Sequence, residues 1–155
     1  MIYWVAIHCG RVITAMNILT DELLSKMMLE PSLDEVLKHT TSTRLTLAEY
    51  LDVLLREKTL KKSVVIAESQ LNQTFAYQIF SGERNPSRNK LLQLAFAMRL
   101  DFHETKRLLR CANVGELYIK NRRDAIIIFC LNNGLSLIQT EEKLYAFGEE
   151  TIVSA

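Results

Sequence analysis

Signals for the start of a helix recur along this chain and constrain its fold more than any other feature. In a capping box, a Ser, Thr or Asp is followed three residues later by Glu or Gln, and each side chain accepts a hydrogen bond from the other residue's backbone N–H. Such boxes occur at Ser32/Glu35, Thr46/Glu49, Asp101/Glu104 and Ser136/Gln139. Apolar residues follow at helical spacing, for example Leu47, Leu51, Leu54 and Leu55. The sequence therefore predicts an all-α fold, a bundle of about eight helices.

Composition and cysteine usage limit the class of protein. The 155 residues are 48% hydrophobic and 24% charged, which is typical of one globular domain or of a small domain with helical extensions. Cys9, Cys111 and Cys130 are odd in number and widely spaced. With three scattered histidines they form neither a disulfide framework nor a set of zinc ligands. We expect free thiols in a reducing cytoplasm, with no metal and no cofactor.

The sequence contains no recognisable catalytic or membrane-spanning segment. It lacks a phosphate-binding glycine loop, the H-E-x-x-H motif, paired cysteines and a nucleophile elbow. Residues 1–15 are apolar, but they lack the basic start of a signal peptide and are too short to cross a bilayer. They form an edge strand or a docked tail, or they precede a natural start at Met16. The chain is expected to be neither an enzyme nor a membrane protein.

The stretch Ser63–Ala97 predicts two short helices, a tight turn, a basic loop and a third helix. Ser63 is expected to cap the first helix and Asn72 the second. Gly82 provides the left-handed residue that ends the second helix, and Ser87 caps the third after the break at Pro86. A helix-turn-helix of this kind is the geometry of many DNA-binding proteins.

The second helix of this stretch has one apolar side and one polar side. Leu71, Ala76 and Ile79 fall at the helical spacing of a buried face. This phase turns four other side chains outward: Gln73, Thr74, Tyr77 and Gln78.

These residues resemble the Cro/C1-type (XRE-like) helix-turn-helix family. Residues 71–74 read L-N-Q-T and residues 78–87 read Q-I-F-S-G-E-R-N-P-S. The family often has I-S-Q-S and then I-x-x-G-x-R-x-P-S at these places, followed by a leucine-rich helix such as the one that contains Leu91, Leu92 and Leu94. The resemblance covers about residues 46–100, and the G-x-R-N-P-S element is its specific part. It implies a lambda-repressor-like helix-turn-helix bundle and a sequence-specific, DNA-binding transcriptional regulator.

The resemblance also assigns contacts with double-stranded DNA. Residues that follow the cap of the second helix would reach base edges in the major groove, where a glutamine amide can pair with adenine. These residues are Gln73, Thr74, Tyr77 and Gln78. Residues before the first helix and in the loop would contact phosphates. They are Lys61, Lys62, Ser63, Arg84, Asn85, Ser87 and Arg88.

The distribution of charge agrees with this assignment. The whole chain has a formal net charge of +1. Residues 1–43 contain 3 basic and 5 acidic groups, residues 44–90 contain 8 and 5, and residues 91–155 contain 8 of each. The excess of positive charge therefore lies on the helix-turn-helix, where phosphate contact would require it.

The predicted organisation has three parts. Residues 1–43 form an N-terminal tail and helical arm, residues 44–113 the DNA-binding domain, and residues 114–155 a C-terminal helical extension. The arm either packs on the domain or contacts a partner. In the extension, Tyr118 is expected to anchor the loop 114–121 to the core, and the helical pair 122–147 to pack or to dimerise. We expect a homodimer, because one such helix reads only a few base pairs.

A second function remains open from the sequence. Phe75 and Phe80 occupy positions that are often polar in the family. Phe80 packs either on the loop or on the first helix, or it belongs to an exposed aromatic patch, and such a patch marks a protein-binding surface. In that case the chain is a protein-interaction module, an antitoxin or an adaptor, with little affinity for DNA.

Overall fold

The computed structural model describes residues 28–29, 32–34 and 45–153. The chain divides into two compact units, Met1–Arg44 and Leu45–Ala155. Only five residues of the first unit are described, and four of them, 28–29 and 33–34, are helical. The predictions for residues 1–15, for the rest of the helical arm and for the capping box Ser32/Glu35 lie outside the described residues.

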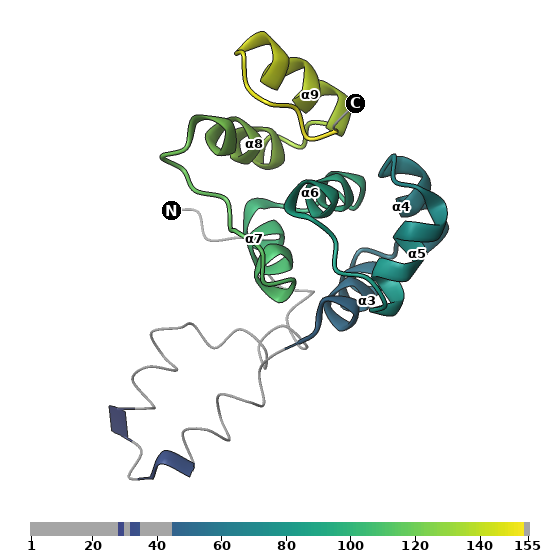
Figure 1. Ribbon diagram of the computed structural model, residues 1–155, viewed down its shortest axis with the longest axis vertical. Helices are drawn as coiled ribbons and strands as arrows, with labels where there is room; N and C mark the ends of the chain where they lie inside the picture. Colours follow the sequence, from purple (N-terminus) through teal and green to yellow (C-terminus); the bar gives the residue numbers. More distant parts are fainter. Residues whose placement is uncertain (1–27, 30–31, 35–44, 154–155) are drawn as a thin grey trace, which may run out of the picture. The chain divides into compact units, whose positions relative to one another are not determined.

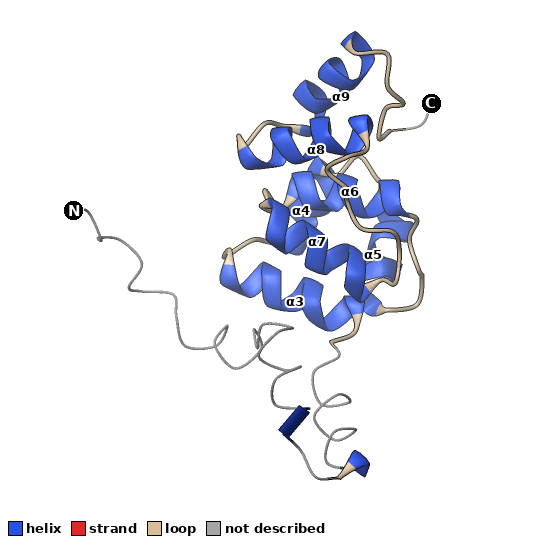
Figure 2. Ribbon diagram, turned by 90° about the vertical axis from the view of Figure 1, so that its left-hand side faces the viewer, coloured by secondary structure: helices blue, strands red, loops and turns tan. Residues whose placement is uncertain are grey.

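The second unit is all-helical, which confirms the predicted fold class for the part of the chain that is described. Over residues 45–153 the backbone forms helices and connecting turns and no strand (Figures 1 and 2). The helices are α3 (Leu47–Glu57), α4 (Lys62–Glu68), α5 (Gln73–Ser81), α6 (Arg88–Ala97), α7 (Phe102–Cys111), α8 (Arg122–Asn132) and α9 (Leu137–Ala146).

The predicted capping boxes of this unit are formed. The Glu49 N–H donates to Thr46 Oγ1 over 3.3 Å, and the Thr46 N–H donates to Glu49 Oε2 over 2.8 Å. The same reciprocal pattern opens α7 and α9. The cap of α8 is of another kind, because Asn121 Oδ1 accepts from the Asp124 N–H over 3.0 Å. With the Asn72 cap of α5, side-chain caps thus stabilise the first turn of five of the helices in this unit.

The ends of the helices share one conformation. The residue after the C-cap, or the cap itself in α5, has a positive φ, and only three of these residues are glycines. The others are Thr59, Gln70, Arg99 and Asn113. After α3, α6, α7 and α8 an apolar residue follows and its N–H bonds back into the last turn, as Leu60 does to the Leu55 carbonyl over 2.9 Å. This is the Schellman arrangement, in which the left-handed residue satisfies carbonyls that the helix leaves open.

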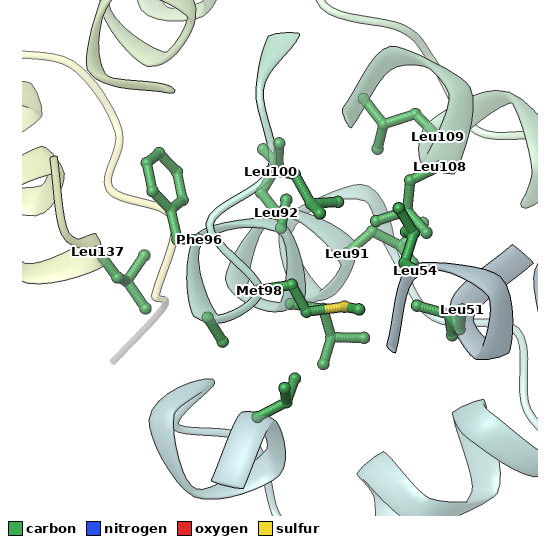
Figure 3. Close-up of a cluster of buried hydrophobic side chains, with 14 of the residues drawn as sticks. Leu51, Leu54, Leu91, Leu92, Phe96, Met98, Leu100, Leu108, Leu109 and Leu137 are labelled. Atoms are coloured by element: carbon green, nitrogen blue, oxygen red, sulfur yellow. The ribbon is translucent and has the colours of Figure 1, made fainter. Parts of the chain in front are cut away.

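A single apolar core extends from α3 to α9. Helix α6 lies at its centre and contacts α4, α7 and α9, while α8 and α9 pack on each other (Figure 1). Figure 3 shows Phe96 and Leu137 at one side of the cluster and Leu51, Leu54 and Leu108 at the other. The C-terminal helical pair is therefore packed into the same core as the helix-turn-helix region.

The polar side chain of Gln93 lies within this apolar core. Gln93 in α6 is fully buried, and neither polar atom of its amide has a hydrogen-bond partner among the described residues. A buried amide without a partner costs about 1–3 kcal/mol. Gln93→Met keeps the side-chain length and removes the polar atoms, so we expect the free energy of unfolding to rise by about 1–2 kcal/mol in urea titrations.

An exposed glutamine provides the control for this substitution. Gln73→Met on the surface of α5 is expected to change stability by less than about 0.5 kcal/mol. If Gln93→Met destabilises the protein while Gln73→Met does not, the Gln93 amide is hydrogen-bonded in the folded protein and the expectation is wrong.

Candidate nucleic-acid interface

A four-residue turn, residues 69–72, joins α4 to α5 and sets the position of α5. Ser69 is fully buried. Its hydroxyl donates to the Ile66 carbonyl over 2.7 Å and accepts from the Leu71 N–H over 3.4 Å. Gln70 follows in the left-handed region at φ 59°. Leu71 is buried in the core. The turn is thus held at both ends, and α5 starts directly after it.

The start of α4 differs from the prediction. Ser63 is not the helix cap: α4 begins at Lys62, with Lys61 as the N-cap and no side-chain cap bond. The Lys61 carbonyl accepts from both the Val64 and Val65 N–H groups. The Schellman turn that ends α3 at Leu60 brings the chain into α4 two residues earlier than a serine cap would. Ser63 lies exposed on the first turn of α4.

Helix α5 has the predicted phase. Asn72 Oδ1 accepts from the Phe75 N–H over 3.2 Å and caps the helix. Ala76 and Ile79 are fully buried. Gln73 and Thr74 are exposed and Tyr77 is 41% exposed, so these three predicted base-contacting residues share the outer face. Gln78, the fourth, is half-buried at the edge of that face.

The two phenylalanines of α5 do not form an exposed aromatic patch. Phe80 is 3% exposed and belongs to the core, and Phe75 is half-buried against it. The Lys62 ammonium lies 5.1 Å from the centre of the Phe80 ring, which places this ring under the start of α4. Of the alternatives left open by the sequence, the exposed aromatic patch is therefore wrong for Phe80, whose ring is buried and contacts Lys62 of α4.

The two lysines before the helix-turn-helix have different surroundings. Lys61 is exposed and forms no ion pair with any described carboxylate. Lys62 is half-buried, lies over Phe80 and is 3.7 Å from Asp52 Oδ1. Lys61 therefore presents its charge to solvent, whereas part of the charge of Lys62 is already compensated.

The loop between α5 and α6 begins with a required glycine. Gly82 has φ 82°, and a Cβ there would meet Ala48 Cβ at an ordinary 3.6 Å, so the backbone conformation and not a lack of space calls for glycine. The Glu83 and Arg84 N–H groups both donate to the Gln78 carbonyl, over 2.9 and 3.2 Å. The side chains of Arg84 and Asn85 are exposed. This loop is anchored by its backbone and presents polar side chains to solvent.

The end of this loop is less regular than predicted. Pro86 is buried, and Ser87 has the backbone conformation of an N-cap, but its hydroxyl makes no cap hydrogen bond. Arg88, the last predicted phosphate contact, points into the protein. Its guanidinium donates to Asp124 Oδ2 over 2.7 Å and to the carbonyls of Gly115 and Glu116. Arg88 thus joins α6 to α8 and to the segment before it. Because its guanidinium already has these partners, Arg88 is not a candidate for phosphate contact.

The loop before α8 is anchored by a different residue from the one predicted. Tyr118 is 58% exposed and is not the anchor, whereas the preceding Leu117 is buried. The Tyr118 N–H donates to Asp124 Oδ2 over 2.9 Å, so its backbone and not its side chain is attached to α8. On α8, α9 and the turn after them, four further large apolar side chains are exposed: Phe129, Ile138, Tyr145 and Phe147.

Other kinds of site are not found in the part of the chain that is described. No three His, Cys, Asp or Glu side chains among those residues are grouped so that they could hold a metal ion. None of the described helices has the length and apolar character needed to cross a membrane. No protein-family model matches the chain, and neither a curated protein nor a solved structure matches it significantly.

Proposed function

We propose that this protein is a sequence-specific DNA-binding transcriptional regulator that inserts α5 into the major groove. The observation that carries the proposal is the capped, polar and solvent-facing side of α5, which follows a tight turn after α4. In this assignment α3–α7 form a lambda-repressor-like domain with α4–α5 as its helix-turn-helix. We place a protein of this function in the cytoplasm.

The exposed side chains of α5 suit contacts with base edges. Gln73 lies directly after the Asn72 cap, at the end of the helix that enters the groove in helix-turn-helix proteins. Its amide can donate to and accept from adenine in a bidentate pair, and Thr74 can contact a thymine methyl group. Tyr77 lies one turn further along the same face. Gln78 is half-buried, so we assign it a contact only at the edge of the groove.

Exposed basic and polar residues before α4 and after α5 suit contacts with phosphates. Lys61 precedes α4, and Arg84 and Asn85 extend from the loop after α5, all of them exposed. Phosphate contacts fix the position of a protein on the duplex and supply affinity without sequence information. Ser63 and Ser87, also exposed, can add neutral hydrogen bonds to the backbone.

Gln73→Ala and Lys61→Ala are expected to weaken DNA binding in different ways. Loss of a base contact at Gln73 should cost about 1–3 kcal/mol on the preferred site and little on random DNA. Loss of a phosphate contact at Lys61 should weaken binding to both DNAs alike and should reduce the salt slope by about one per subunit. Titrations of both DNAs at several salt concentrations measure these effects. Lys61 is a cleaner probe than Lys62, because Lys62 also contacts Phe80 and Asp52.

The same titrations distinguish the two functions. A variant that only destabilises the fold would weaken binding to every DNA and would not change discrimination. If the wild-type protein binds all DNA sequences equally at low salt, and neither substitution has an effect, the regulator proposal is wrong. The outer face of α5 around Tyr77 would then be examined as a surface for a protein partner.

We also propose that the protein is a homodimer through the exposed apolar face of α8 and α9. Ile138 and Tyr145 are seven residues apart on one side of α9 and are 61% and 81% exposed. Large apolar side chains grouped on a surface are typical of interaction sites. A dimer also supplies the second reading helix that a symmetric operator requires.

Substitutions on this face are expected to dissociate the dimer without unfolding the protein. Truncation after α7 is unsuitable, because it would remove α8 and α9, which pack on α7 and α6 and contribute Ile127, Leu131 and Leu144 to the same core. Ile138→Glu/Tyr145→Lys should instead shift the sedimentation mass from twice 17.8 kDa to 17.8 kDa while the helical spectrum is retained. Gln73→Glu, which changes charge on α5, is the control and should remain dimeric. An unchanged mass of the double variant would assign the dimer to another surface.

A further inference from the structure

The first turn of α6 lacks the usual local stabilisation. Its N-cap, Ser87, forms no side-chain cap bond, although α3, α5, α7, α8 and α9 all have one. The N–H groups at a helix start need partners, and a missing cap leaves the first turn free to fray. This turn directly follows the loop that presents Arg84 and Asn85.

Two consecutive residues of this turn are held by two consecutive residues of α8. Arg88 donates to Asp124 Oδ2 over 2.7 Å, and Asp124 is 5% exposed. Next to it, the Arg123 guanidinium donates to Asn89 Oδ1 over 3.1 Å. These contacts join positions 34 and 36 residues apart in the sequence. The start of α6 is thus fixed from the C-terminal helical pair and not by its own cap.

Arg123 extends this connection to the end of the described chain. Besides Asn89 it donates to the carbonyl of Glu150 over 2.7 Å and to that of Thr151 over 3.2 Å. The same C-terminal segment is held by Glu141, whose carboxylate accepts from the Ile152 N–H over 2.7 Å, and Ile152 is buried. One guanidinium therefore connects the first turn of α6, the start of α8 and the C-terminal segment.

We propose that Arg123 and Asp124 are positioning residues for DNA binding. They hold the first turn of α6, and through it the loop Gly82–Ser87, in the conformation that contacts phosphate. The C-terminal helical pair is then a part of the DNA-binding machinery, although it touches no DNA. This inference rests on the proposed function, since it concerns the loop that the proposal assigns to phosphate contact.

Neighbouring arginines provide a matched pair of variants. Arg122 and Arg123 both bond to carbonyls after α9, Arg122 to that of Phe147 over 3.2 Å, but only Arg123 also reaches Asn89. Arg123→Ala and Arg122→Ala therefore remove the same charge and contacts with the C-terminal segment, which for Arg122 include an ion pair with Glu149 Oε1 at 3.4 Å. Only Arg123→Ala also removes the link to α6. Asn89→Ala breaks this link from the other side and leaves the C-terminal segment intact.

The first measurement uses the full chain and the DNA site with the highest wild-type affinity. Arg123→Ala and Asn89→Ala are expected to weaken binding about tenfold each, with a lower salt slope, while Arg122→Ala remains within about threefold of wild type. The double variant Arg123→Ala/Asn89→Ala should be no weaker than Arg123→Ala alone, because both substitutions remove one contact. Equal loss in Arg122→Ala and Arg123→Ala would overturn the inference, since only the charge would then matter.

The second measurement needs no DNA. Hydrogen exchange of the segment 82–91 reports the Leu91 N–H, which donates to the Ser87 carbonyl over 3.1 Å in the first turn of α6. Arg123→Ala and Asn89→Ala should speed exchange in this segment and leave α5 unchanged, whereas Arg122→Ala should leave both unchanged. If exchange of the segment is the same in all variants, the positioning role is wrong. If exchange changes as expected but wild-type protein binds no DNA, the proposed function fails and the structural link remains.

Discussion

Ile79→Asp is expected to unfold the unit Leu45–Ala155. Ile79 is fully buried in α5 and belongs to the core that includes Leu51 of α3 and Leu91 of α6. No described cation is available inside this apolar cluster to pair with a carboxylate. Burial of an unpaired charge costs more than about 5 kcal/mol, which is comparable to the whole stability of a domain of this size. Far-ultraviolet dichroism and thermal melting measure the loss.

Thr74→Asp is the matched control for this substitution. It introduces the same carboxylate five residues earlier in α5, at an exposed position in the first turn. A negative charge there interacts favourably with the positive end of the helix, so the melting temperature should stay within a few degrees of wild type. A native-like melt of Ile79→Asp would show that Ile79 is exposed and that the phase assigned to α5 is wrong.

Asp124→Ala is expected to lower the free energy of unfolding by about 3 kcal/mol, because it leaves the partly buried Arg88 guanidinium without its carboxylate. It also removes the acceptor of the Tyr118 N–H. Urea titration measures the change. Because Asp124→Ala destabilises the whole fold, its effect on DNA binding would not report the positioning role. Substitutions of Arg123 and Asn89 are therefore used for that test.

Glu116→Ala provides the comparison for an exposed ion pair. Glu116 is 2.9 Å from Arg110 Nε and 3.5 Å from Lys106, and these side chains lie largely in solvent. The hydrogen bond from Arg110 lowers the pKa of Glu116. A lowered pKa means that the pair stabilises the fold above the ordinary pKa of glutamate, and that this contribution is lost as the pH falls through the lowered pKa. We expect Glu116→Ala to cost less than about 1 kcal/mol at pH 7. Equal losses for Asp124→Ala and Glu116→Ala would contradict the distinction between buried and exposed pairs.

Local features of this fold could be predicted from the sequence. The boxes Thr46/Glu49, Asp101/Glu104 and Ser136/Gln139 involve residues three positions apart, so their hydrogen bonds depend on little beyond the local chain. The burial of Ile79 and the exposure of Gln73 follow from helical periodicity. Such signals are consistent with one another over residues 45–153, and the all-helical class was predicted correctly for this reason.

A left-handed residue at a helix end was predicted only at Gly82. Thr59, Arg99 and Asn113 adopt the same conformation without a glycine to signal it. The available signal was the apolar residue after each, such as Leu60 or Leu100, which packs back on the helix and offsets the strain. The wrong assignment of Ser63 as a cap has the same origin, because the turn at Leu60 determines where α4 begins.

Contacts between distant residues could not be predicted. Arg88 was assigned to phosphate because the resemblance places it after the loop, and nothing near it in the sequence indicates Asp124, 36 residues away. Gln93 is polar within an apolar helix, and burial on all sides of α6 leaves it in the core. Both cases depend on where α8 and α9 pack, and local patterns contain no information on that packing.

Selection of binding sites from random double-stranded DNA tests the central claim most directly. Purified wild-type protein, at low salt and then at physiological salt, should enrich one common sequence. A dimer should enrich it as two symmetric half-sites about 10 base pairs apart. Gln73→Ala, taken through the same selection, should lose preference at one position of each half-site and keep the others. A pool that remains random after repeated selection at low salt would contradict the assignment of α5 as a DNA-reading helix.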